Sequence, residues 1–232
     1  MRPGQGQQSP GTDRVAERII RTSLDLMGDA TLGTVSRRVV LRRYRHAGHE
    51  IHDIADIREF DIAVPDRLAR VIPGRWQIIA GAAGMATGLS GLPGLITDIP
   101  TLLGLNLTAI GECACTYGFD VADEEEHAYA IALLLQGDEP GDEGDILSQL
   151  HRTALRMTKG SSWMRLNGYA AASWLRQAAM RLARRLIRRK LGQFVPVIGT
   201  VVGGGVNAAF TRRTCEMARR VYRRRFIHEF GQ

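Results

Sequence analysis

The chain has 232 residues, of which 44% are hydrophobic and 24% charged, and this composition excludes wholesale disorder and suits one compact domain or at most two. Its net charge of +7 is divided unevenly, because residues 1–150 carry a net −9 and residues 151–232 a net +16. The basic part is expected to seek anions in a partner or in the acidic part of the same chain. The three cysteines have no zinc-type spacing, and their odd number argues against a disulfide framework.

The N-terminal third of the chain predicts a tail followed by helices. Residues 1–12 are rich in Gly, Gln and Pro and lack the apolar run of a secretory signal, so we expect a disordered tail in a cytoplasmic protein. Apolar residues at helical spacing then predict a helix after Thr12, a second helix around Val39–Leu41 and a short third helix over Ile51–Ile57. These helices would occupy residues 13–75. Since no alternating strand pattern occurs, the expected fold is all-α.

The most unusual segment is Trp76–Gly111, which contains seven glycines and a single formal charge, Asp98. Glycines and a proline form a turn signal at Gly88–Gly94 in its middle, so the segment predicts two apolar helices joined by a tight bend. A second uncharged stretch covers residues 191–211. We expect residues 76–230 to form a single helical, bundle-like domain with the preceding helices, and the glycine-rich hairpin to lie in its core.

Both apolar stretches are poor transmembrane helices, which need about 20 consecutive apolar residues. Glycine and proline interrupt the first, and polar residues and a glycine triplet interrupt the second. A buried helical core is therefore the favoured interpretation, and shallow insertion at a membrane interface is the alternative. The spacings Gly84-x-x-x-Gly88 and Gly199-x-x-x-Gly203 would let helices approach closely, within the chain or in a homo-oligomer.

Four polar residues within or beside the apolar stretches are candidates for a polar cluster in the core: Asp98, Asn106, Glu112 and Asn207. Asp98 precedes a proline near the expected start of a helix, so the favoured interpretation is that its carboxylate caps that helix. If the four side chains instead converge around a pocket, they would form the candidate enzyme site of this sequence. Neither a phosphate-binding glycine loop nor a serine-hydrolase motif occurs, and we identify no catalytic residue.

Two patterns resemble parts of metal sites. One is formed by histidines and aspartates that would share a helical face, namely His49, His52, Asp53 and Asp56. The other, Glu124-x-x-His127, is half of a di-iron motif and lacks the second half. We interpret the first as an exposed polar face. We interpret the second as acids on a solvated first turn of a helix, after a glycine cap at Gly118 and with Asp120 as N-cap. The sequence therefore predicts no metal and no other cofactor.

The C-terminal part contains two basic helical patterns. In the first, arginines follow one helical face and apolar residues another, and the second lies after residue 211. The arginines expected to bind an anionic surface are Arg181, Arg184, Arg185, Arg188, Arg220 and Arg224. Trp163 and Trp174 would be interfacial anchors or core residues. Lipid headgroups, nucleic-acid phosphates and the acidic segment 112–145 are the alternative partners of these arginines.

Two glycine-rich segments give the chain a family resemblance. The sequences Gly88–Pro100, Tyr117–Asp120 and Val195–Thr211 are similar to the EcsC protein family, and the basic segment Ala218–Arg225 also fits. The resemblance covers about residues 75–226, and the preceding part matches only as helices. It implies an α-helical protein of the bacterial cytoplasm or the inner membrane surface, with a role linked to ABC transport or secretion. It assigns no catalytic residues, because no biochemical activity is established for the family.

Three functional hypotheses follow. The leading one is a non-enzymatic accessory protein at the cytoplasmic face of the membrane, whose partner is the anionic bilayer or a component of a membrane transporter. The alternative is a nucleic-acid-binding module that uses the same arginines and loses affinity steeply with salt. The third is an uncharacterised enzyme with a site around Asp98.

Overall fold

The computed structural model describes residues 31–88, 91–136 and 199–231, together with Arg18, Thr22 and Leu186. All regular structure in this part of the chain is helical, so the predicted all-α class is confirmed. The helices in chain order are α2 (Thr31–His46), the 3-10 helix η1 (Ala55–Glu59), α3 (Ala63–Ala69), α4 (Ile72–Gly88), α5 (Gly91–Thr116), α6 (Glu124–Gln136) and α9 (Gly199–Phe230). The predicted tail 1–12 and the helix after Thr12 fall outside the described residues, apart from Arg18 and Thr22.

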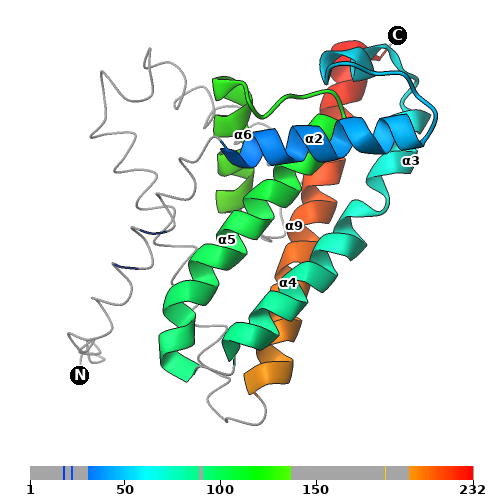
Figure 1. Cartoon of the computed structure of the whole chain (residues 1–232). Coiled ribbons are helices and arrows are strands. Elements are labelled where there is room, and N and C mark those ends of the chain that lie inside the picture. Colours follow the sequence, from blue (N-terminus) through cyan, green and yellow to red (C-terminus); the bar gives the residue numbers. More distant parts are fainter. Residues whose placement is uncertain are drawn as a thin grey trace, which may run out of the picture.

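Three long helices, α4, α5 and α9, lie side by side and form the body of the molecule (Figure 1). Helix α2 crosses this group near one end and packs mainly on α5, and α6 also packs on α5. The core contains large side chains from all of them, including Tyr44 of α2, Ile110 of α5 and Phe210 and Tyr222 of α9, which are fully buried. Since α4 begins at Ile72, it spans the expected boundary between residues 75 and 76, and the division of the chain there remains a prediction.

The predicted glycine-rich hairpin is confirmed. Helix α4 ends at Gly88 and α5 begins at Gly91, so the bend is shorter than the turn signal suggested, and Pro93 and Gly94 belong to α5. A proline is tolerated in the first turn of a helix because the amide nitrogens there have no partner within the helix. Helix α4 packs most extensively on α9, and small residues on both helices allow the close approach. This approach centres on Gly81 and Gly204, close to the two spacings that predicted it.

The short helix predicted over Ile51–Ile57 is wrong in its extent. Gly48, with φ +86°, ends α2 in a left-handed turn, and an irregular loop continues to the 3-10 helix η1. The carboxylate of Asp56 holds this loop, because its Oδ2 accepts hydrogen bonds from the backbone amides of His52 (2.8 Å) and Asp53 (2.9 Å). The apolar spacing was a core signal nonetheless, since all three isoleucines of the segment are buried.

The end of α5 follows the prediction more closely. Gly118 has φ +80°, and the amide of Phe119 donates to the carbonyl of Ala114, as in a helix that closes on a left-handed residue. Helix α6 begins at Glu124, later than expected. Asp120 therefore does not cap it. Its Oδ1 instead accepts from the amide of Ala122 (2.9 Å) in the turn that precedes α6.

Candidate functional site

Asp98 lies within α5, seven residues after the first residue of the helix, so the interpretation as a helix cap is wrong. Its side chain is only 4% exposed. Its Oδ1 accepts hydrogen bonds from Thr87 Oγ1 of α4 (2.5 Å) and Asn207 Nδ2 of α9 (3.0 Å). The carboxylate therefore joins the three long helices instead of satisfying a helix end, and it does so because α5 begins earlier than the turn signal predicts.

The other candidate core residues make separate contacts. Asn106 Nδ2 donates to the carbonyl of Leu102 and to Thr211 Oγ1 of α9, at 2.7 and 3.0 Å. Glu112 binds Arg43 of α2 through Oε1 and Arg75 of α4 through Oε2, and Trp76 Nε1 donates to Oε2 at 2.9 Å. Along α5 these groups are separated by about 12 Å and about 9 Å, at 1.5 Å per residue. The four side chains thus form three groups along the helix, and only Asp98 and Asn207 touch.

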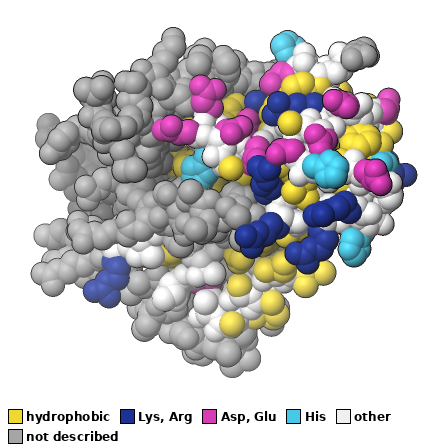
Figure 2. Space-filling view, turned by 45° about the horizontal axis from the view of Figure 1, so that its top comes forward, with side chains coloured by type: hydrophobic (Ala, Val, Ile, Leu, Met, Phe, Trp, Pro, Cys, Tyr) yellow, Lys and Arg dark blue, Asp and Glu magenta, His cyan; other side chains and the backbone are white. Residues whose placement is uncertain are grey.

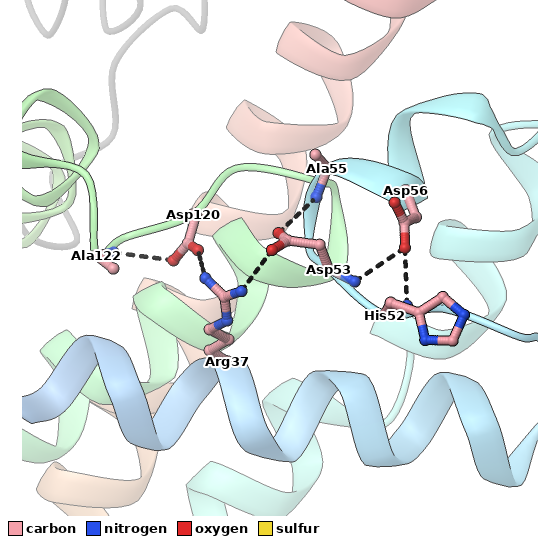
Figure 3. Close-up of polar contacts among 7 residues, drawn as sticks. All are labelled: Arg37, His52, Asp53, Ala55, Asp56, Asp120 and Ala122. Atoms are coloured by element: carbon pink, nitrogen blue, oxygen red, sulfur yellow. Dashed lines mark hydrogen bonds and ion pairs between the residues drawn. The ribbon is translucent and has the colours of Figure 1, made fainter.

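Of the histidine–aspartate group, His49, His52 and Asp53 lie on the irregular loop after α2 and Asp56 lies in η1, so the four residues do not share one helical face. Figure 3 shows three of them. Arg37 of α2 points between Asp53 and Asp120 and donates to both carboxylates at 2.5 Å. A backbone hydrogen bond from Ala55, reinforced by the charge of Arg37, lowers the pKa of Asp53. The carboxylates are therefore occupied by backbone amides and a guanidinium, which hold the loop against α2. Among the described residues, no group of three or more His, Cys, Asp and Glu side chains is arranged to hold a metal ion.

Glu126 contradicts the interpretation of the acidic residues at the start of α6 as a solvated face. Glu124 and Glu125 are exposed, but Glu126 is buried, and both of its oxygens accept from Nη1 of Arg225, at 2.8 and 3.0 Å. The guanidinium lies over the rings of Phe119 and Tyr129, with centroid distances of 4.1 and 4.4 Å. Burial raises the pKa of Glu126, and the charge of Arg225 opposes that shift. The acidic segment thus neutralises part of the basic C-terminal region within the chain.

The remaining C-terminal arginines are partly accounted for. On α9, Arg212 pairs with Glu216 (2.9 Å) and Arg223 with Asp66 (2.8 Å). Arg220 and Arg224 are exposed residues of the same helix. The other arginines predicted to bind an anionic surface, and the two candidate tryptophan anchors, lie outside the described residues: Arg181, Arg184, Arg185, Arg188, Trp163 and Trp174.

A cationic row on α2 is the strongest functional candidate, and no pattern in the sequence sets it apart from the other arginines. Arg38, Arg42 and Arg45 are exposed and follow at the i, i+4 and i+7 spacing of one helical face. Within residues 31–88, 91–136 and 199–231, no carboxylate pairs with any of them, and Arg45 donates only to the carbonyl of Leu41 (3.3 Å). Their neighbours Arg37 and Arg43 turn inward to the ion pairs described above. We call these three residues the α2 arginine row.

An apolar stripe on α4 begins about one helical turn after Arg75, which shares Glu112 with Arg43 of α2. Ile78 is 74% exposed and Met85 48%, and Ala82 between them is also exposed. Helices α2 and α4 meet at Glu112, which binds an arginine from each. Figure 2 shows a group of Lys and Arg side chains near the middle of the view, with hydrophobic side chains directly below it, and most of the Asp and Glu side chains lie above it together with further Lys, Arg and hydrophobic side chains. Exposed apolar patches with a polar rim mark sites of protein or membrane contact.

A membrane contact would differ from a membrane span. Across the described part of the chain, we find no helix with the length and apolar character that crossing a bilayer requires.

Comparisons with known proteins agree with the resemblance seen in the sequence. The model of the EcsC protein family matches residues 12–227, and so includes the N-terminal helices that were not part of that resemblance. The uncharacterized protein YdbA of Bacillus subtilis (strain 168) is 27% identical over 177 residues, which are 76% of this chain and 63% of YdbA. This chain thus spans less than two thirds of YdbA. Protein EcsC of the same organism is 24% identical over 174 residues, which are 75% of this chain and 69% of that protein. No solved structure matches significantly. Since the family match covers most of its length, the chain belongs to the EcsC protein family.

Proposed function

We propose that this protein is a peripheral accessory protein that docks on an anionic membrane surface through the α2 arginine row. The observation that carries the proposal is the exposure of Arg38, Arg42 and Arg45 on one face, with no carboxylate partner among the described residues. Each basic residue near an anionic bilayer contributes about 1 kcal/mol, so three contribute about 3 kcal/mol at physiological salt. That energy alone gives weak, reversible docking, as expected of an accessory protein.

The neighbouring apolar side chains favour a bilayer over nucleic acid. Both partners supply phosphate groups to arginine, but only a bilayer also accepts exposed side chains such as Ile78 and Met85. The exposed arginines Arg220 and Arg224 of α9 would form an additional contact with the same surface. A location at the cytoplasmic face of the membrane, and a transporter component as a further partner, belong to this proposal through the family resemblance.

Vesicle flotation tests the proposal. Purified full-length protein is mixed with vesicles of neutral phosphatidylcholine, or of phosphatidylcholine with 30% phosphatidylglycerol, at low and high salt. The expected result is flotation with the anionic vesicles, and at least a tenfold weaker affinity for the double variant Arg38→Glu/Arg42→Glu. The comparison variant Arg220→Glu/Arg224→Glu changes two exposed arginines of α9 and is expected to have the smaller effect.

Two outcomes contradict this assignment. If neither vesicle type binds and duplex DNA does so with a steep salt dependence, the nucleic-acid hypothesis replaces it. If the α9 variant loses binding and the α2 variant keeps it, the C-terminal arginines form the docking surface and the α2 row does not.

A further inference from the structure

We infer that the apolar stripe of α4, formed by Ile78, Ala82 and Met85, inserts into the acyl-chain boundary of one leaflet while the α2 arginine row stays at the headgroups. This inference rests on the proposed membrane docking and adds to it a second, apolar mode of attachment. The three side chains are exposed and follow at helical spacing. From Ile78 to Gly88, α4 has a single polar side chain, Thr87, unlike an ordinary surface helix, which is polar on its solvent face.

Beside the stripe, the described parts of α4, α5 and α9 contain no exposed charge. Helix α4 contains no charge after Arg75, and the adjacent part of α9, residues 199–211, contains none. In α5, the only charge before Glu112 is Asp98, whose carboxylate is buried and hydrogen-bonded to α4 and α9. Insertion would therefore remove no exposed charge of these helices from water, and that desolvation is the cost that normally keeps protein surfaces out of lipid.

The distance along α4 from Arg75 to Met85, the last residue of the stripe, matches the hydrocarbon thickness of one leaflet. Met85 follows Arg75 by ten residues, which corresponds to about 15 Å along a helix. The hydrocarbon core of a bilayer is about 30 Å thick, so each leaflet supplies about 15 Å. Arg75 is 40% exposed and shares Glu112 with Arg43 of α2, which places both helices together at the charged end of the stripe. The stripe would thus reach into the acyl chains while the arginines remain among the headgroups.

Charge complementarity favours a bilayer over a protein as the occupant of the stripe. An anionic leaflet presents negatively charged headgroups next to apolar acyl chains. The surface of this protein presents arginines next to apolar side chains, so the two surfaces match (Figure 2). A second copy of this chain would place its own arginines beside the arginines that flank the stripe, and these like charges would repel. No exposed carboxylate of α4 is available to neutralise it, since α4 contains no acidic residue.

Substitutions on the stripe separate insertion from electrostatic docking. The variants Ile78→Glu and Ala82→Glu place a charge on exposed positions, so folding should be unaffected. The matched control is Ile227→Glu, because Ile227 is 44% exposed near the other end of α9. We expect wild type and control to stay bound to anionic vesicles when the salt is raised, and both stripe variants to bind at low salt and to be released at high salt, with at least a tenfold loss of affinity.

A fluorescent reporter gives an independent readout. The environment-sensitive dye NBD is attached to Ala82→Cys or, as a control, to Ile227→Cys, because the native cysteines are buried. Emission is expected to shift to the blue on anionic vesicles for the label at 82 and to stay unchanged at 227.

Each adverse result has a distinct meaning. If the protein binds anionic vesicles but is fully released by salt and the label at 82 stays in water, insertion is wrong and docking stands. If no vesicle binds the protein, both proposals fail. If Ile78→Glu turns a dimer into a monomer in sedimentation and leaves flotation unchanged, the stripe is an interface between copies of this chain.

Discussion

Gly204 of α9 faces Gly81 of α4 so closely that Gly204 has no room for a larger residue without movement. A Cβ atom built on Gly204 would lie 2.9 Å from the carbonyl oxygen of Gly81 and 2.6 Å from Cγ of Met85. A Cβ on Gly81 would lie 3.4 Å from that of Ala208. The glycines therefore set the distance between α4 and α9, and with it the position of the α4 stripe beside the rest of the molecule.

The first prediction concerns this crossing. Gly204→Ala should lower the free energy of unfolding by about 1–3 kcal/mol, because the added methyl group meets backbone that can move only with the helix. Gly205→Ala is the matched control, since a Cβ there has nothing within 4 Å. In a helix interior, alanine is favoured over glycine by about 1 kcal/mol, so the control should gain stability. Urea unfolding of both variants measures the difference, and equal stabilisation of the two would contradict the close crossing.

The second prediction concerns Arg225. Arg225→Lys should destabilise the protein by about 1–3 kcal/mol, because lysine lacks the planar group that lies over Phe119 and Tyr129 and also contacts Glu126. The same change at its exposed neighbour Arg224 should alter the free energy of unfolding by no more than about 0.5 kcal/mol. Thermal and urea unfolding of the two variants provide the comparison. An unchanged stability of Arg225→Lys would mean that the aromatic contacts contribute nothing.

The third prediction concerns Glu112, which neutralises two arginines from different helices. Glu112→Gln should cost about 3 kcal/mol, since it leaves Arg43, whose side chain is only 15% exposed, without a carboxylate partner. The exposure of Arg75 keeps the expected loss at the low end of the range for buried pairs, because its guanidinium can turn toward water. Glu59→Gln, at an exposed position, is the control. If both variants unfold at the same urea concentration as wild type, Glu112 has no stabilising role.

Signals from residues close together in the sequence correctly predicted the hairpin bend, one helix end and several core positions. The turn chemistry around Gly88, the cap at Gly118 and the apolar spacing of Ile51, Ile54 and Ile57 all correspond to features of the structure, because each depends on residues close in sequence. The interpretation of Asp98 as a helix cap was wrong for a local reason as well. The turn signal was assigned more residues than the structure uses, and a carboxylate that belongs to a helix interior was therefore placed at a helix end.

Long-range pairing explains what the sequence could not show about charge. Glu126 meets Arg225 across 99 positions, and Arg37 meets Asp120 across 83. In α2, the pattern shows arginines at 37, 38, 42, 43 and 45 but not which of them find acids elsewhere in the chain. Only the fold divides them into inward ion pairs and an exposed row. For this reason the sequence directed the anion-binding hypothesis to the C-terminal arginines and overlooked α2.

The last prediction concerns the three thiols. Cys113, Cys115 and Cys215 are buried and form no disulfide, and burial raises the pKa of Cys115 and of Cys215 to about 12. At pH 8 roughly one thiol in ten thousand would then be ionised, and the thiolate is the reactive form. The native protein should therefore react negligibly with a thiol reagent, and unfolded protein should release three equivalents of chromophore. Ile227→Cys is the positive control, because its thiol would be exposed and should react at once.

The raised pKa values of these thiols also determine how the free energy of unfolding changes at alkaline pH. The ordinary pKa of a cysteine thiol is 9.0, so above that pH the unfolded chain loses thiol protons that the native chain retains until about pH 12. The free energy of unfolding should consequently fall as the pH rises from 9 toward 11. Cys215→Ala should make this fall shallower, because it removes one of the shifted groups, and urea unfolding at pH 8 and pH 10.5 measures the change. Rapid reaction of two or more native thiols at pH 8 would show instead that α5 and α9 open readily where these cysteines lie.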